Sequence, residues 1–194
     1  MAEAIPALKA AEDAVNCITK ADIAVLKGLA KPPPDVKNVT AVVCMFFGIK
    51  PDVKMNPETQ KKEKDYWGPS VKMMMDPNFL KNLVGYDKEG IQQDLVDTIH
   101  PIITQDNFQA ERLKNVSAVA MNLAKWVHAM DKFYRVNKIV KPKKEQLAIA
   151  EEKYASVMKV LKVKQSELQK IVDKVNALEA DLRDTQNRKA SLEA

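Results

Sequence analysis

Apolar residues recur every three to four positions over most of the chain, which is the spacing of one face of an α-helix. The pattern is longest at the C-terminal end, where residues 143–194 contain neither glycine nor proline. With Leu147 at position a of a heptad, eleven of the fourteen a and d positions up to Leu192 are apolar. The other positions are mostly charged or polar, so this segment predicts one strand of a coiled coil.

A shorter version of the same pattern occurs at the N-terminal end. Counted from Leu8, its a and d positions are Leu8, Ala11, Val15, Ile18, Asp22, Val25 and Leu29. A helix packed on a core would show the same spacing, because seven positions do not distinguish a core-facing stripe from a coiled-coil seam. The C-terminal strand needs a partner, however, and we expect the two arms to pair with each other.

Prolines stand where each arm meets the middle of the chain. Proline removes a backbone donor and disfavours helix in the residue before it. We therefore expect Pro32, Pro33 and Pro34 to end the first arm and Pro142 to mark the start of the second. The predicted parts are an outgoing arm over residues 1–31, a globular head over residues 32–141 and a returning arm over residues 142–194.

Within the head the heptads stop and shorter helices are expected. Pro34 suits a first helical position, and an apolar stripe follows it as far as Gly48. Residues 49–70 contain three prolines and the lysine-rich run QKKEK, and they predict a long surface loop. Further helices are expected before Gly85, before Pro101, after Asp106 and from about Ser117 to Val140. The fold class is all-α, an antiparallel coiled-coil hairpin capped by a small helical bundle.

The last of these helices has two different faces. Trp126 and Met130 are four residues apart and fall on one side, which we expect to face the core. Lys125, Lys132 and Arg135 fall on another side, which we expect to face solvent. Residues 114–144 hold eight basic residues against Asp131 alone, a net charge of +7, whereas both arms are neutral. This concentration of charge predicts an acidic partner and binding that weakens with salt.

Residues that could carry catalysis are missing. The chain has no phosphate-binding G-x-x-x-x-G-K-[ST] or G-x-G-x-x-G motif. His100 and His128 are the only histidines, and neither has a second ligand at metal-binding spacing, so we expect a plain surface role for His128. Residues 73–75, three methionines, predict core packing or a flexible contact. We expect no enzyme activity, metal or cofactor in these residues.

Three classes of acidic partner come into question: nucleic acid, an acidic protein and an anionic membrane. Basic coiled-coil readers of DNA carry their charge on a helix continuous with the zipper, and few aromatics are available here for stacking on bases. A membrane would require a bulky apolar face free of core packing. By elimination we expect an acidic protein, with neither nucleic acid nor membrane as partner. A non-motor coiled-coil adaptor, binding an acidic protein or nucleic acid, is the alternative.

Several stretches of the chain resemble dynein heavy chains of the axonemal type. Residues 31–37 (KPPPDVK) and 43–48 (VCMFFG) resemble the junction where the outgoing stalk helix enters the head. Residues 115–117 (NVS), 125–127 (KWV), 129–131 (AMD) and 140–142 (VKP) resemble the last head helices and the return into the stalk. Residues 65–70 (DYWGPS) and 85–88 (GYDK) are similar to the axonemal members.

The resemblance implies a stalk tip with about six short helices that binds microtubules in the groove between α- and β-tubulin. It implies an ATP- and Mg-binding AAA+ ring outside these residues and a place in the cytoplasm, on the cytoskeleton of the ciliary or flagellar axoneme. An axonemal light chain is a further candidate partner of the head. Carried over by position, the microtubule contacts are Lys37 on the first head helix and Lys125, Lys132, Arg135 and Lys138 towards the end of the last.

The resemblance also implies that the stalk signals by sliding one arm against the other by about half a heptad. Asp22 is a poor residue for an a position, and the adjacent Val25 and Leu26 offer apolar side chains for two registers. The prolines at residues 32–34 and at Pro142 would then connect arm register to the head.

Overall fold

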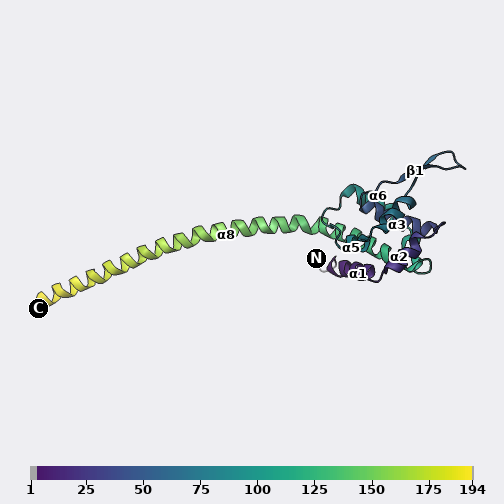
Figure 1. The fold of residues 1–194 in the computed structure, drawn as a ribbon. Helices are drawn as coiled ribbons and strands as arrows, with labels where there is room; N and C mark the ends of the chain where they lie inside the picture. The colour runs from purple at the N-terminus through teal and green to yellow at the C-terminus, as the bar shows by residue number, and fades with distance from the viewer. Residues whose placement is uncertain (1–3, 194) are drawn as a thin grey trace. The chain divides into compact units, whose positions relative to one another are not determined.

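The computed structural model describes residues 4–193, and Figure 1 traces their path. The chain divides into two compact units, residues 1–140 and residues 141–194, which are described separately. Residues 1–3 and 194, which the two predicted arms include, lie outside the described residues. The elements are α1 (Ala4–Asn16), α2 (Lys20–Lys27), α3 (Pro34–Phe46), β1 (Asp52–Met55), β2 (Lys62–Asp65), α4 (Trp67–Met75), α5 (Phe79–Val84), α6 (Gln93–Ile103), the 3-10 helix η1 (Asp106–Phe108), α7 (Ala110–Leu113) and α8 (Ala118–Leu192).

Helix α3 forms where the sequence predicts it and lies at the centre of the head. Pro34 occupies its first turn, where a missing N–H leaves no hydrogen bond unmade. Val36, Val39 and Val43 are fully buried among α4 and α6. Gly48 follows the helix with a φ of 68°, a left-handed conformation that residues with a Cβ rarely adopt. The mostly helical fold is therefore confirmed, built around this helix.

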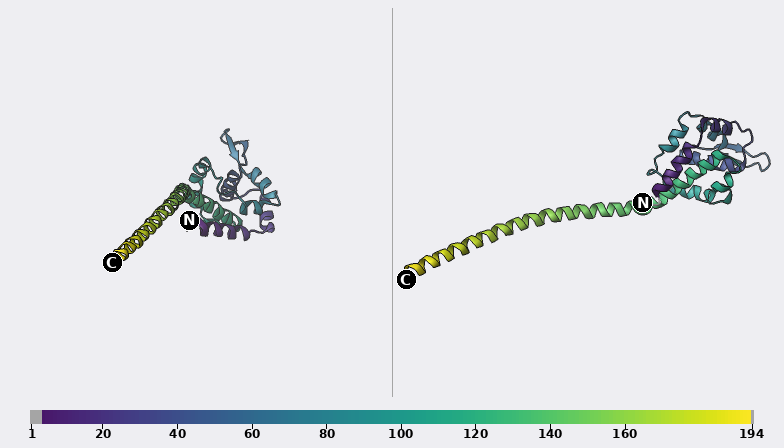
Figure 2. Two further views of the ribbon diagram at one scale, coloured as in Figure 1. Left: turned by 90° about the vertical axis from the view of Figure 1, so that its left-hand side faces the viewer. Right: turned by 90° about the horizontal axis from the view of Figure 1, so that it is seen from below.

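The first 31 residues differ from the single arm that we predicted. They form two helices, α1 and α2, separated at Cys17 and Ile18. Ala11, Val15 and Ile18 are buried in the core of the head, and α1 lies alongside the first part of α8 (Figure 2). The apolar stripe of α1 thus packs on the head's own core, which a heptad-like spacing also permits.

A capping box at the start of α2 accounts for Asp22. The Thr19 side chain accepts a hydrogen bond from the Asp22 backbone N–H, and the Asp22 carboxylate accepts one from the Thr19 backbone N–H at 2.9 Å. The Thr19 hydroxyl also donates to this carboxylate at 2.7 Å; this bond is the main cause that lowers the pKa of Asp22, and the bond from the Thr19 backbone N–H adds to it. Leu26 is buried and Val25 is 70% exposed, so these two residues are not equivalent choices for one seam. The capping box gives Asp22 a local role at the start of a separate helix, and the role of Asp22, Val25 and Leu26 in stalk register stays a prediction.

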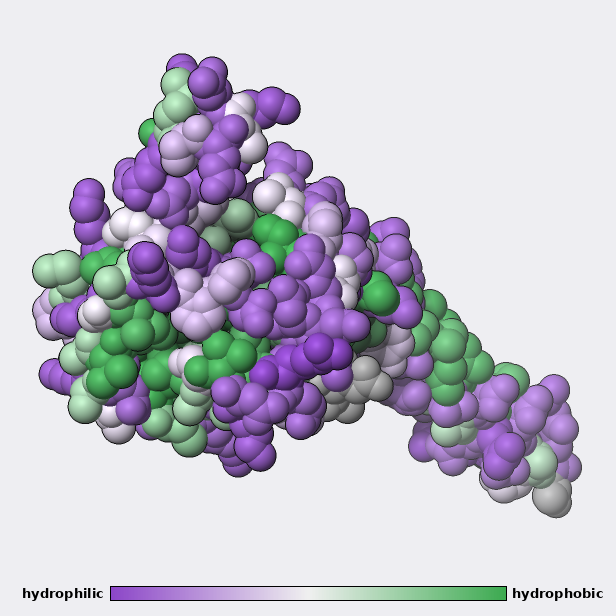
Figure 3. Space-filling view, turned by 90° about the vertical axis from the view of Figure 1, so that its right-hand side faces the viewer, coloured by the Kyte–Doolittle hydropathy of each residue, from purple (hydrophilic) through white to green (hydrophobic). Residues whose placement is uncertain are grey.

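The predicted loop over residues 49–70 contains regular structure. Strands β1 and β2 pair antiparallel, with Asp52 opposite Asp65 and Met55 opposite Lys62, and α4 follows directly. The residues of β1 are exposed on both faces, so the segment lacks the inside–outside alternation by which a strand is recognised. Figure 3 shows the hairpin projecting from the head with a mostly hydrophilic surface.

Two prolines lie inside helices that we expected to end at or near them. Pro101 is within α6, and Pro142 is within α8, which we predicted to stop near Val140. A proline inside a helix removes one backbone hydrogen bond and costs about 3 kcal/mol. Long runs of good helix formers on both sides of Pro142, including Lys, Glu, Ala and Leu, favour continuation of the helix.

The second unit consists of the remainder of α8. Its predicted helical structure is confirmed up to Leu192, and every described side chain in residues 141–193 is exposed. The a and d residues of the predicted seam are among them. Ion pairs between successive turns, such as Arg188 with Asp184 at 3.0 Å, support the helix locally.

Candidate functional site

The first turns of α8 hold the basic side chains in place through Trp126. Its indole is 1% exposed, and the indole N–H donates a 2.9 Å hydrogen bond to the backbone oxygen of Leu83. Phe46 and Tyr86 contact the ring edge-on at 5.2 and 5.4 Å between centroids, while Phe47 stacks parallel to it at 6.2 Å. The prediction that Trp126 and Met130 face the core is confirmed. The orientation of α8 in the head is therefore fixed.

Lys125 and Lys132 lie on the solvent side of α8, as predicted. Both are exposed and fall seven residues apart, nearly in line along the helix. Within residues 4–193 neither of them forms an ion pair. Two cations without an internal carboxylate partner are available to an acidic surface outside the chain.

Arg135 joins α8 to α6. Its Nε donates to the Asp131 carboxylate at 2.9 Å, and its Nη2 lies 2.8 Å from His100 Nδ1. Because a guanidinium can only donate, Nδ1 of His100 is the acceptor and carries no proton in this arrangement. The hydrogen bond that Arg135 donates to the Asp131 carboxylate is the main cause that raises the pKa of Arg135. Arg135 is still half exposed, so it is both positioned and accessible.

Lys138 and Tyr134 bind the same side chain of α6. The Gln93 carboxamide oxygen accepts from the Tyr134 hydroxyl at 2.6 Å and from Lys138 Nζ. Gln93 and His100 therefore hold two consecutive turns of α8 against α6. Neither Gln93 nor His100 was predicted to orient side chains of α8, because single-sequence patterns do not reveal a contact between side chains about forty positions apart.

Lys37 stands on α3, beside the base of the β-hairpin. It lines a hollow together with Lys54 and Asp65 of the hairpin and Ile102 of α6. The Asp65 carboxylate pairs with Lys54, and the hydrogen bond from Lys54 is the largest cause that lowers the pKa of Asp65. Helix α6 thus lies next to both Lys37 and Arg135. The five predicted contact residues are not one cluster but two groups linked by α6.

His128 differs from the predicted surface role. It is half-buried, its Nε2 lies 3.3 Å from the Phe108 backbone oxygen, and its ring meets that of Phe108 edge-on. Packing on η1 therefore occupies this histidine. Among residues 4–193 no group of histidine, cysteine and acidic side chains is arranged to hold a metal ion. No described helix combines the length and apolar character needed to cross a membrane.

Comparisons with known proteins agree over the whole chain. A family model described as the microtubule-binding stalk of dynein motor matches residues 1–193. The chain is 40% identical over 195 residues to dynein axonemal heavy chain 3 of Homo sapiens, covering all of this chain and 5% of that protein. It is 32% identical to the dynein-1-beta heavy chain of the flagellar inner arm I1 complex of Chlamydomonas reinhardtii, covering 79% of this chain and 3% of the relative.

Among solved structures, the fold is similar to that of the microtubule-binding domain of dynein-c. The TM-score is 0.63 at 34% sequence identity, and the match covers 73% of this chain and 92% of the other. The chain spans only about one twentieth of the length of dynein axonemal heavy chain 3 of Homo sapiens.

Proposed function

The chain belongs to the family of microtubule-binding stalks of dynein motors, and from this premise we propose that it is the stalk tip of an axonemal heavy chain that binds α/β-tubulin through the basic side chains of α3 and α8, two of which are held by α6. The observation that carries the proposal is the row of exposed cations on α8, held in place by Trp126 and by α6. Tubulin is the acidic partner that this surface would meet.

The proposed contacts divide into two kinds. Lys125 and Lys132 extend freely into solvent and would act as mobile point charges, which are well suited to long-range attraction. Arg135 and Lys138 are held by His100 and Gln93 and would set the orientation of the bound head. Lys37, beside the hairpin, would extend the contact along α3.

The rest of the motor cycle lies outside these residues. We propose that the full-length protein hydrolyses ATP with Mg in a AAA+ ring, acts in the ciliary or flagellar axoneme and can receive a light chain on the head. In this proposal residues 4–193 bind the microtubule and transmit the signal along the stalk, and they contain no reaction centre.

We also propose that stalk register sets microtubule affinity. Leu147 and Tyr154 of the seam are exposed and need a partner strand, and the described part of residues 1–31 offers exposed apolar side chains such as Ile5 and Val25. Once Cys17 and Cys44 are replaced, engineered cysteine pairs can lock the returning strand against the outgoing one in either of two registers, four residues apart. The two locked forms should differ in microtubule affinity. Equal affinities would make the stalk a passive tether.

Co-sedimentation tests the tubulin contact. The chain should pellet with taxol-stabilised microtubules, and duplex DNA should not displace it. Its affinity for microtubules should fall several-fold between low and physiological salt, because charges are screened beyond about 8 Å at physiological salt. Tight binding to DNA would favour the coiled-coil adaptor. A microtubule affinity that does not change with salt concentration would contradict a contact made by exposed lysines.

A further inference from the structure

Three consecutive methionines at the end of α4 have no role in the surface described above. Met73 and Met74 are buried, whereas Met75 is 62% exposed. Met73 lines one hollow in the surface of the head, and Met74 and Met75 line a second. Both hollows also reach Asp76 and Phe79, so they adjoin each other on either side of this segment.

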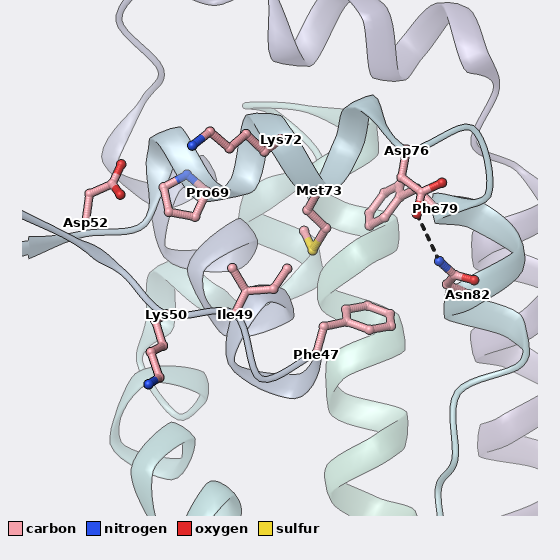
Figure 4. Close-up of a pocket in the computed structure, with 10 residues that line it drawn as sticks. All are labelled: Phe47, Ile49, Lys50, Asp52, Pro69, Lys72, Met73, Asp76, Phe79 and Asn82. Carbon is pink, nitrogen blue, oxygen red and sulfur yellow. Dashed lines mark hydrogen bonds between the residues drawn. The ribbon is translucent and has the colours of Figure 1, made fainter.

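The first hollow has a volume of about 460 Å³ and an apolar floor. Figure 4 shows Phe47 and Ile49, from the end of α3, together with Met73 of α4 in the middle of this hollow. Lys50 and Lys72 lie at its edge. A concave site of this size, with an apolar floor and charged side chains at its margin, can enclose one bulky apolar side chain.

The second hollow, of about 410 Å³, lies between α2 and the segment joining α4 to α5. Ile23 and Leu80 add apolar surface to that of the methionines. Methionine side chains are flexible and polarisable, so they adapt to apolar groups of different shape. The exposed Met75 is the side chain that would gain most from a bound partner.

Lysines surround both hollows. Five of them, against two aspartates, line the pair: Lys20, Lys27, Lys50, Lys72 and Lys81, with Asp52 and Asp76. The Asp76 carboxylate already accepts from the Asn78 backbone N–H at 2.8 Å and from the Asn82 carboxamide at 3.4 Å. In the part of the chain that the structure describes, none of these lysines has an ion pair.

We propose that the two hollows bind an acidic segment of a partner protein, with one bulky apolar side chain in each hollow and carboxylates facing the lysines. Helices α2, α4 and α5, with residues 47–52 that follow α3, supply this site, whereas the proposed tubulin contacts come from Lys37 near the start of α3 and from the cations of α8. The partner would therefore bind alongside a microtubule and not in its place. Charge complementarity would favour its encounter, and the apolar side chains would give the complex its lifetime.

A fluorescence anisotropy titration of the complete chain tests this site. The probe is a set of fluorescein-labelled glutamate-rich peptides that carry two phenylalanines at increasing separation. At one separation the chain should bind the peptide, and Met75→Glu or the pair Lys27→Glu and Lys81→Glu should weaken binding roughly tenfold or more, because each places like charges together. Lys132→Glu is the matched control and should leave peptide binding unchanged.

Peptides with alanine in place of phenylalanine separate the contribution of charge to binding from that of the bulky apolar side chains. If they bind as tightly as the phenylalanine peptides, or if no peptide binds, the proposal is wrong. Microtubule co-sedimentation of the same variants gives the second test. Met75→Glu should keep full microtubule affinity while Lys132→Glu loses it; if Met75→Glu loses as much, the hollows belong to the tubulin surface and the separate site is refuted.

Discussion

Replacing Trp126 by alanine should remove most of the stability of the head. A buried tryptophan hides about 150–250 Å² of surface, which corresponds to roughly 4–6 kcal/mol at 25 cal/mol per Å². The ring is 1% exposed and contacts three aromatic rings between 5.2 and 6.2 Å. The cavity would not close without moving α3 and α5, so we expect a loss near the top of the measured range for such changes, about 4–5 kcal/mol.

The size of this loss matters because small domains are stable by only about 5–15 kcal/mol. With a urea dependence of about 2 kcal/mol per molar, the unfolding midpoint of the head should fall by about 2 M. Trp67 is the other tryptophan of the chain, and its fluorescence reports on the head without the helical signal of residues 141–193. A far-ultraviolet measurement would mix the two units.

Trp126→Phe is the matched control, since it also leaves Trp67 as the single fluorophore. It keeps an aromatic ring in the site but leaves the Leu83 oxygen without its donor, which costs about 1–3 kcal/mol. The two variants should therefore differ clearly. Equal midpoints for Trp126→Ala and Trp126→Phe would refute the reasoning, because cavity formation would then contribute nothing.

Three further predictions follow from other contacts of the head. Arg135→Glu should weaken microtubule binding by about 1–3 kcal/mol and also lower the urea midpoint, because it replaces the bonds to Asp131 and His100 by a like charge four residues from Asp131, whereas the same reversal at Arg183, outside the candidate site, should have little effect on either. Thr19→Ala should lower the stability of the head by about 1 kcal/mol through loss of the capping box, and its effect should not add fully to that of Asp22→Ala, since the Thr19 hydroxyl also donates to the Asp22 carboxylate at 2.7 Å. Ellman's reagent should label the exposed Cys17 in the folded chain but Cys44 only after unfolding, because burial raises the pKa of the Cys44 thiol and excludes the reagent; equal rates would contradict its position in the core.

Sequence patterns predicted the elements whose boundaries are set by local chemistry. Helix α3 is the best case, because Pro34 and Gly48 act on their own backbone and need no distant partner. The two faces of α8 were also predictable, since Trp126 and Lys125 differ in polarity at helical spacing. The stripe of α1 packs on the core of the head, which the sequence alone could not distinguish from pairing with a second strand, because both require the same spacing of apolar residues.

The candidate site was predictable only in its charged residues. Lysines and arginines on one face of α8 are visible in the sequence, but the side chains that orient them are not. His100 and Gln93 belong to another helix, and their role depends on how α6 packs on α8. The hollow beside Lys37 likewise exists only because the hairpin returns to the end of α3.

The hairpin offers a place to attach a reporter to the head. Val53 and Met55 are exposed, so the strands add nothing to the core, and the turn is closed locally by the hydrogen bond from the Asn56 N–H to the Lys61 oxygen at 2.9 Å. A tag or fluorescent peptide inserted between Pro57 and Thr59 would leave the Asp65 contact to the start of α4 intact. Because exposed loop tips tolerate insertions well, distances from this point to a labelled filament could be followed by energy transfer while the head binds and releases.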